Sequence, residues 1–302
     1  MRFMRRWPDP VPGPQRGIAL VVVLWGTLML AVMAAGYGQG ARTETVVAQQ
    51  IVRAAQARAL AEAAIYQGIY DLFKPQNLRR FRPDGTVQEL PASDAQVALS
   101  IQDVAGLIDI NAASEELLDG ALNAAGLDIE RRTPILNAVL DWRDKDNLHR
   151  QSGAEDPEYE RAGLTYGAKD GPFDTIEELQ QVLGMPPETY QALKSLVTVY
   201  SRQAGVNQML APSTVLRAIP GADPTQIESY IQARQAAAVP GQATAAPPPP
   251  FQSRFNSGQS GQAYVLSAQA RVSGGGAVRL QATVRISRQV DNPYSILSWR
   301  DG

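Results

Sequence analysis

The strongest pattern in the sequence is an uncharged apolar run near the N-terminus. Residues 18–35 read IALVVVLWGTLMLAVMAA, and none of these 18 residues carries a charge. Because roughly 20 apolar residues cross the hydrocarbon core of a bilayer as a helix, we predict a transmembrane helix at residues 18–40. Apolar residues then recur in three- and four-residue steps, which predicts an amphipathic helix over residues 41–73.

Alternation of apolar and polar residues predicts strands on both sides of a long middle segment. Strands are expected at residues 96–102, 262–272 and 277–286, with a turn at three consecutive glycines, 274–276. Residues 294–299 favour a last edge strand. We expect these strands to form a small antiparallel sheet that packs on the amphipathic helix.

The middle segment predicts a bundle of short helices. Thr133-Pro134, Pro187, Pro212-Ser213 and Asp223-Pro224 each stand where a helix is expected to begin, because proline suits the first helical position and Ser or Asp suits the cap. Residues 236–261 are rich in Ala, Pro, Gly and Gln, which predicts a mobile loop.

The predicted fold class is therefore α+β. An N-terminal transmembrane and amphipathic helix packs on a small antiparallel sheet, and a large all-α insert interrupts that sheet. The expected division is a leader at 1–17, a transmembrane helix at 18–40, the second half of the helix with the first strands at 41–109, the helical insert at 110–235, a flexible loop at 236–261 and the C-terminal strands at 262–302.

Composition excludes several kinds of chemistry. The chain has no cysteine, so disulfides, iron–sulfur clusters and thiol catalysis are excluded. It has one histidine, His149, so a Ser-His-Asp triad would have to use it. With 28 basic and 30 acidic residues, the near-neutral balance argues against a protein that coats nucleic acid.

The residues before the apolar run predict an exported protein. Arg2, Arg5, Arg6 and Arg16 face a single Asp9, which predicts an N-terminus inside the cell and a translocated remainder. One alternative is an ordinary signal peptide cleaved near Ala34. Arg16-Gly17 directly before Ile18 resembles a prepilin-type signal, which implies cleavage after Gly17 by prepilin peptidase and methylation of Ile18.

One position departs from that prepilin resemblance. Most pilins and pseudopilins carry glutamate at the fifth mature position, where this chain has Val22. A carboxylate in lipid needs a partner, and in that family the partner is the N-terminal amine of the subunit above. Val22 therefore favours a subunit with nothing above it, at the tip. The alternative is a plain membrane anchor.

An acidic loop is the best candidate for a chemical site. Counted from Asp144, Asp146 falls at position 3 and Glu155 at position 12, the spacing of a helix–loop–helix calcium loop. Leu148 and His149 stand where that loop has a ligand and a glycine, so a standard loop of this kind is not expected. The spacing alone leaves a different calcium site and a solvated acidic loop as equal alternatives.

The loop and the residues after it resemble the general secretion pathway protein K family, the large minor pseudopilin of type II secretion. The similar residues are Trp142, Asp144, Asp146, Gly153-Ala154-Glu155-Asp156, Tyr159, Gly171-Pro172-Phe173 and Glu178-Leu179. The resemblance implies calcium binding by Asp144, Asp146, Glu155 and Asp156, together with Asp141 and Asp170. Asp170 stands where the family often has asparagine.

The same resemblance implies a pseudopilin fold and a non-enzymatic role. The protein would sit at the tip of the type II secretion pseudopilus, help start its assembly and support protein export across the outer membrane. Its partners would be other minor pseudopilins, pseudopilus subunits and prepilin peptidase. It would cross the inner membrane once, with a cytoplasmic N-terminus and a periplasmic main domain.

Residues 218–222 (AIPGA) also resemble the hairpin of helix-hairpin-helix repeats, which in some proteins binds DNA phosphates. Acidic flanks and only four lysines in the chain oppose such binding here, so we expect no nucleic acid. The rival functions are a membrane-anchored DNA-uptake protein and a membrane-anchored hydrolase that uses Asp144 and Glu155.

Overall fold

The structure is a computed structural model that describes residues 18–237, 246–249, 253–287, 289 and 291–301, with only the backbone described for residues 35–43. The chain divides into two compact units, Met1–Arg53 and Ala54–Gly302. The predicted leader, including the processing residue Gly17, lies outside the described residues, as do residues 238–245 and 250–252 of the predicted loop.

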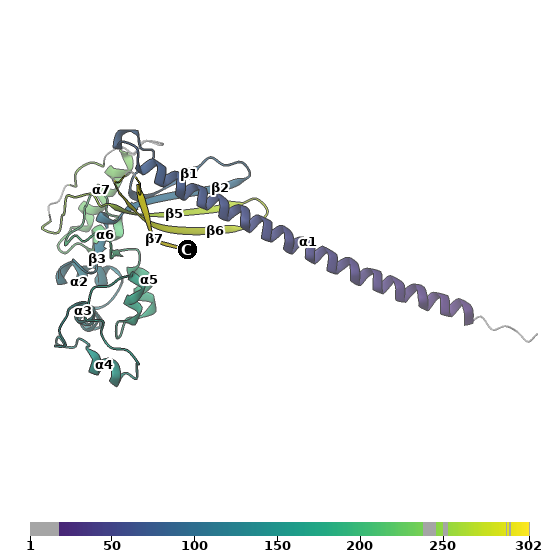
Figure 1. The fold of residues 1–302 in the computed structure, drawn as a ribbon, viewed down its shortest axis with the longest axis horizontal. Coiled ribbons are helices and arrows are strands. Elements are labelled where there is room, and N and C mark those ends of the chain that lie inside the picture. The colour runs from purple at the N-terminus through teal and green to yellow at the C-terminus, as the bar shows by residue number, and fades with distance from the viewer. Residues whose placement is uncertain (1–17, 238–245, 250–252, 288, 290, 302) are drawn as a thin grey trace, which may run out of the picture. The chain divides into compact units, whose positions relative to one another are not determined.

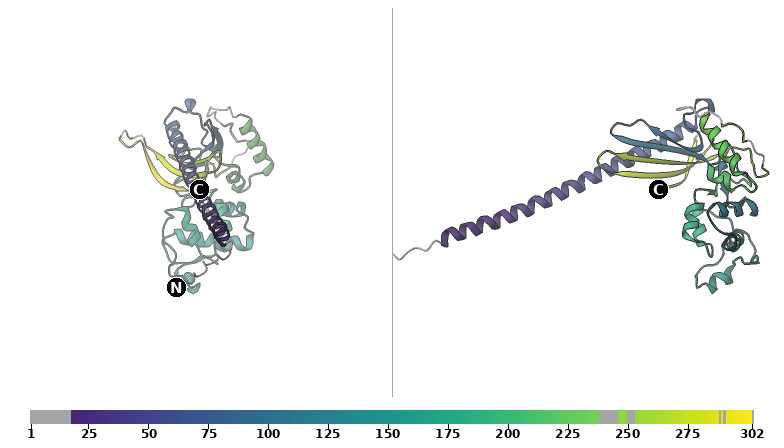
Figure 2. Two further views of the ribbon diagram at one scale, coloured as in Figure 1. Left: turned by 90° about the vertical axis from the view of Figure 1, so that its right-hand side faces the viewer. Right: turned by 180° about the vertical axis from the view of Figure 1, so that it is seen from behind.

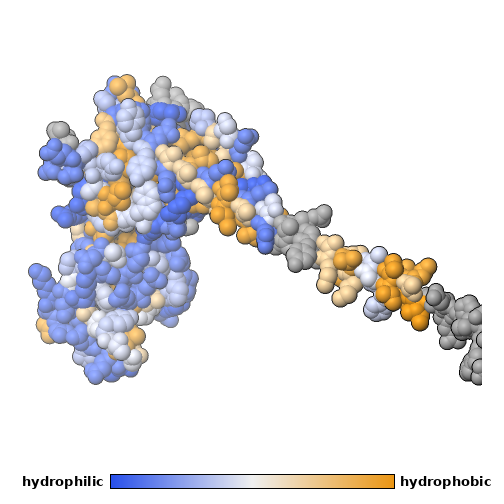
Figure 3. All heavy atoms as spheres, turned by 45° about the vertical axis from the view of Figure 1, so that its right-hand side comes forward, coloured by the Kyte–Doolittle hydropathy of each residue, from blue (hydrophilic) through white to orange (hydrophobic). Residues whose placement is uncertain are grey.

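Helix α1 (Ile18–Leu72) begins in the first unit, where its described side chains are exposed except the half-buried Arg53. Apolar residues dominate residues 18–34, with Leu20 at 73% and Trp25 at 70% of full exposure, and they form much of the coloured surface of that segment in Figure 3. Within the described part of the chain, no helix combines the length and the apolar character of a membrane span. The predicted span at 18–40 is therefore not confirmed.

In the second unit, residues 54–72 of α1 pack on a sheet, as Figure 1 and both views of Figure 2 show. The buried positions recur at three- and four-residue steps, which is why one face of the helix meets the sheet. They are Ala57, Ala61, Ala64, Ile65, Ile69 and Leu72. At Gly68 a Cβ atom would stand 2.7 Å from Leu266 Cδ2, so the lack of a side chain allows the close approach.

The sheet has five antiparallel strands in the order β1-β2-β5-β6-β7. Its faces alternate, since β2 and β6 bury every second residue against α1 and present polar residues on the other face. The predicted strands are confirmed, and the mainly polar edge strand β1 is additional. The bounds are β1 (Asp84–Leu90), β2 (Ala95–Asp103), β5 (Ala263–Val272), β6 (Ala277–Ile286) and β7 (Tyr294–Asp301).

A helical domain is inserted between β2 and β5. The chain leaves the sheet after Asp103 and returns at Ala263, and Asp103 pairs with Tyr264 across the two strands. The buried Asp103 carboxylate accepts hydrogen bonds from Ala105 N (2.9 Å), Gly261 N (2.9 Å) and Ser260 Oγ (2.6 Å). The outgoing and returning segments are thus fastened to one side chain, whose pKa is raised by its burial.

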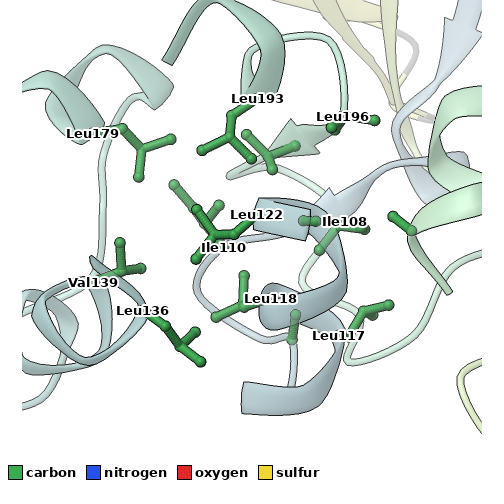
Figure 4. Close-up of a cluster of buried hydrophobic side chains, with 14 of the residues drawn as sticks. Ile108, Ile110, Leu117, Leu118, Leu122, Leu136, Val139, Leu179, Leu193 and Leu196 are labelled. Atoms are coloured by element: carbon green, nitrogen blue, oxygen red, sulfur yellow. The ribbon is translucent and has the colours of Figure 1, made fainter. Parts of the chain in front are cut away.

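The inserted domain has its own apolar core, separate from the core beneath the sheet. In Figure 4, leucines of α2 and α3 point toward Ile108, Ile110, Leu193 and Leu196. The elements are η2 (Val104–Gly106), β3 (Ile108–Asp109), α2 (Glu115–Ala124), α3 (Ile129–Arg143), α4 (Asp156–Arg161), η3 (Ile176–Gln181), α5 (Pro187–Leu193), β4 (Val197–Thr198), α6 (Ser213–Ala218) and α7 (Pro224–Ala236), while η1 (Gln76–Leu78) follows α1.

Three expectations about this region were wrong. Helix α3 does not begin at Thr133-Pro134; Asp128 caps it by accepting from Arg131 N at 3.0 Å, and Pro134 lies inside. The insert is not all-α, because β4 pairs in parallel with β3. Residues 253–261 are anchored and not a free loop, since Phe255 is buried and its carbonyl accepts from Val206 N at 2.7 Å.

We predict that Gly120→Ala destabilises the helical domain. A Cβ atom at Gly120 in α2 would stand 2.0 Å from the carbonyl oxygen of Ala218 at the end of α6, and a backbone atom cannot turn aside. Overpacking costs about 1–3 kcal/mol, which exceeds the gain of about 1 kcal/mol in helix propensity. Urea unfolding should show a net loss of up to about 2 kcal/mol, whereas the exposed substitution Gln232→Ala in α7 should change little. Equal stability of the two variants would contradict this packing.

Candidate metal centre

The acidic loop connects α3 to α4, beside an aromatic cluster. Trp142 stacks on Phe173 with 6.0 Å between ring centroids, and Tyr159 lies 5.9 Å from Trp142. Tyr159 is fully buried, its hydroxyl accepts from Leu183 N at 3.0 Å, and burial raises its pKa to about 12. This packing fixes the end of α3 and the start of α4, so the carboxylates between them are held on a rigid base.

Asp141 organises the loop from inside. It is fully buried, and its carboxylate accepts from Arg150 N (3.1 Å to Oδ2) and Ala154 N (2.9 Å to Oδ2). At Gly153 a Cβ atom would stand 2.0 Å from Asp141 Oδ2, so glycine is required for this approach. Because these donors already meet its oxygens, Asp141 holds the loop and is less free to bind a metal than its neighbours.

Asp144 presents one bonded and one free oxygen. Its Oδ2 lies 2.5 Å from Arg150 Nη1, and the same nitrogen lies 2.7 Å from Asp141 Oδ1. The other oxygen, Asp144 Oδ1, is buried without a hydrogen-bond partner. A buried acceptor with no donor is costly, so this atom is a candidate ligand for a cation.

Glu155 is the carboxylate of the loop whose charged form is most disfavoured by its surroundings. It is 1% exposed, and neither of its oxygens has a hydrogen-bond partner. Burial, and to a smaller extent the charges of nearby aspartates, together raise its pKa to about 7. Those aspartates are Asp141, Asp144, Asp170 and Asp146.

The three remaining predicted ligands, Asp146, Asp156 and Asp170, are exposed at the rim. Asp170 adopts a left-handed backbone conformation with φ of 54°. Its pKa is raised by partial desolvation and by the charges of three aspartates, among them Asp146 and Asp156. Asp156 lies against the backbone at Gly167, where a Cβ atom would overlap its carboxylate. The rim residues are therefore coupled to the cluster through charge.

In the described structure the carboxylates are not arranged as a metal-coordination site. Across the described residues, no group of three or more His, Asp or Glu side chains stands in a geometry that could hold a metal ion. The donor set nevertheless fits a hard cation, because calcium takes six to eight oxygen ligands, mostly from carboxylates and carbonyls. The three unpartnered oxygens of Asp144 and Glu155 are the atoms that such an ion would satisfy.

The sequence analysis missed the residues that support the loop. Arg150 binds two of the predicted ligands, and Asn111 holds Phe173 by accepting from its N–H (2.8 Å) and donating to its carbonyl (2.9 Å). A basic residue inside an acidic run was a visible signal for Arg150. Asn111 lies far away in sequence, so no local pattern could have indicated it.

The hairpin between α6 and α7 lacks free basic residues for phosphate binding. Arg217, at its start, pairs with Glu228 at 3.3 Å, and the Asp223 carboxylate caps α7 by accepting from Thr225 N at 2.7 Å. A phosphate at this hairpin would meet carboxylates. This arrangement opposes the DNA-binding alternative.

The protein has an α+β fold, in which a helix packs on an antiparallel sheet and a helical domain is inserted between two strands. A chain in the crystal structure of the GspK–GspI–GspJ complex, from the type 2 secretion system of enterotoxigenic Escherichia coli, shares this fold with a TM-score of 0.52. The match has 19% sequence identity and covers 87% of this chain and 99% of that chain.

Sequence comparison narrows this class to a family. The family model for type II secretion system protein K matches residues 77–202, which include the acidic loop. A putative type II secretion system protein K of Escherichia coli (strain K12) is 26% identical over 204 residues, and the match spans 62% of that protein. The family model and this relative confirm the resemblance to type II secretion system protein K that the sequence shows.

We predict that Asp141→Ala destabilises the protein in the presence of chelator. The change leaves the buried amides of Arg150 and Ala154 without an acceptor, a loss of about 2–3 kcal/mol, whereas Asp146→Ala removes an exposed side chain and should change stability by less than about 0.5 kcal/mol. Chemical unfolding with EDTA measures both values. A small effect of Asp141→Ala would show that the loop does not depend on this carboxylate.

Proposed function

We propose that this chain is the minor pseudopilin at the tip of the type II secretion pseudopilus, where it helps to start assembly and supports export across the outer membrane. The observation that carries the proposal is the family match over residues 77–202, which contain most of the inserted helical domain. The related crystal structure is of a complex with GspI and GspJ, which supports other minor pseudopilins as partners. The role is structural assembly and not catalysis.

Two features support the tip position. Val22 provides no carboxylate for the N-terminal amine of a subunit above it, so a subunit stacked there would leave that amine unpaired in lipid. The inserted domain also adds a large body at the end of strands β2 and β5, and such a body is accommodated most easily where no further subunit follows.

The proposal includes membrane anchoring and processing. Residues 18–34 are uncharged and their apolar side chains are exposed in the first unit, and the preceding arginines favour a cytoplasmic N-terminus. We propose a single crossing of the inner membrane by the 18–40 segment, with the main domain in the periplasm. Prepilin peptidase would cut between Gly17 and Ile18 and methylate the new N-terminus.

The intact mass of the protein co-expressed with a prepilin peptidase tests this part. We expect loss of residues 1–17 and the addition of one methyl group, because the cleavage motif directly precedes the apolar segment. Gly17→Leu should leave the chain uncut and serves as the control. An uncut wild type, or a cut near Ala34, would contradict the proposed processing.

We further propose that the acidic loop binds calcium. Asp144 and Glu155 would supply the inner oxygens, while Asp146, Asp156 and Asp170 would complete the site from the rim and Asp141 would hold the loop. The unpartnered buried oxygens of Asp144 and Glu155 support this assignment. When bound, calcium would supply charge neutralisation that stabilises the folded loop.

Thermal unfolding of the wild type and Glu155→Gln tests the calcium proposal. Calcium at 100 times its dissociation constant should stabilise the wild type by about 2.7 kcal/mol. Glu155→Gln should lose most of that gain yet be at least as stable as the wild type in EDTA, because it removes a buried, repelled charge. Glu130→Gln, an exposed change on α3, should behave like the wild type. A full calcium response in Glu155→Gln would exclude this carboxylate as a ligand.

A further inference from the structure

Arg150 is the cation that directly contacts the carboxylate cluster in the described structure. Its Nη1 atom lies 2.7 Å from Asp141 Oδ1 and 2.5 Å from Asp144 Oδ2. Two other arginines near the loop are engaged elsewhere. Arg143 donates to the carbonyls of Ile110 (2.5 Å) and Ala113 (3.0 Å), and Arg161 pairs with Glu158.

One guanidinium is not enough for this cluster. Arg150 leaves Asp144 Oδ1 and both oxygens of Glu155 without a partner, and four aspartates act on Glu155 with repulsive charge. Arg150 therefore neutralises the part of the cluster nearest the end of α3 and leaves the buried Glu155 carboxylate uncompensated.

The Arg150 side chain is able to separate from the carboxylates. Its side chain is 40% exposed, so the guanidinium has a path to water. Its backbone is held independently, since Arg150 N donates to Asp141 Oδ2 at 3.1 Å. The side chain can move out without unfolding the loop that carries it.

We propose that Arg150 is a built-in counter-ion that occupies Asp144 when calcium is absent and is displaced from it when calcium binds. This inference rests on the proposed calcium site. In the calcium-free protein the arginine offsets repulsion and keeps the loop closed. On binding, Asp144 exchanges the guanidinium for the metal, while Asp141 keeps its backbone donors and holds the loop in place.

The exchange has a cost that sets the calcium affinity. Calcium must break a charge-assisted hydrogen bond before Asp144 becomes available, so the observed affinity is lower than that of the bare carboxylates. The same arginine makes the domain less dependent on calcium for folding. The side chain at position 150 therefore sets the balance between calcium affinity and stability without calcium.

Calorimetric calcium titration and melting in EDTA, on the full chain in detergent, test the inference. We expect Arg150→Gln to bind calcium about tenfold more tightly than the wild type and to melt at a lower temperature in EDTA, with Arg150→Lys between the two. Arg161→Gln is the matched control, because Arg161 pairs with Glu158 outside the cluster, and it should leave the affinity unchanged.

The outcomes separate the inference from the site on which it rests. Calcium binding that is equally tight in the wild type and Arg150→Gln would overturn the counter-ion role and leave the metal centre standing. No binding by any variant would overturn both.

A second measurement follows the Arg150 side chain directly in the wild type, with Arg150→Lys used only to assign its signal. In a nitrogen-15 spectrum, the Arg150 side-chain Nε–H signal, assigned by its loss in Arg150→Lys, should move on calcium addition to the position of a solvent-exposed arginine. A signal that stays unchanged at saturating calcium would overturn the displacement.

Discussion

The antiparallel pairing of β2 with β5 is the constraint on which the second unit depends. These strands lie side by side although the whole helical domain separates them in sequence. Closing a long connection costs only slightly more entropy than closing a moderate one, so the sheet can accept a folded domain between two neighbouring strands. The Asp103 carboxylate fastens both ends of that domain at the point where they meet.

The two apolar cores on either side of this junction are separate, and polar side chains connect them. Asp84 of β1 pairs with Arg82 at 2.7 Å and lies 3.8 Å from Arg234 of α7, which donates to the carbonyl of Ala211 at 2.7 Å. Arg300 of β7 likewise pairs with Glu177 of the helical domain. Buried ion pairs such as Arg82–Asp84 contribute little net stability, and a half-exposed pair such as Arg300–Glu177 contributes little as well, so these contacts orient the domain on the sheet more than they stabilise it.

Electrostatic repulsion and its compensation determine the conformation of the acidic loop, as apolar packing determines that of the two cores. Aromatic packing brings the ends of α3 and α4 together, so the negative charges between them need compensation, and burial and nearby aspartates raise the pKa of Glu155. Arg150 provides part of that compensation, and calcium would provide the rest. A loop that is closed by arginine and that calcium would strengthen would keep its domain folded with or without the metal.

The sequence by itself determined the elements whose signals are local. Alternation predicted β2, β5, β6 and β7, the three-and-four spacing predicted the amphipathic half of α1, and proline and aspartate caps predicted the start of α5, α6 and α7. The acidic loop and its family resemblance were also predictable from the sequence, because the predicted ligands lie close together in the chain. The predicted helix start at Thr133-Pro134 was wrong because Asp128, six residues before Pro134, caps α3.

Only the tertiary structure decided how these parts meet. It showed that β1 forms an edge, that β3 and β4 pair within the helical domain, and that Phe255 anchors a segment whose composition favoured a free loop. It also divided the predicted ligands into Asp141, whose oxygens hold the loop, and Glu155, whose oxygens are left unpartnered. Sequence specifies which residues can be ionised or buried, but desolvation and repulsion depend on distances between residues that only the folded chain brings together.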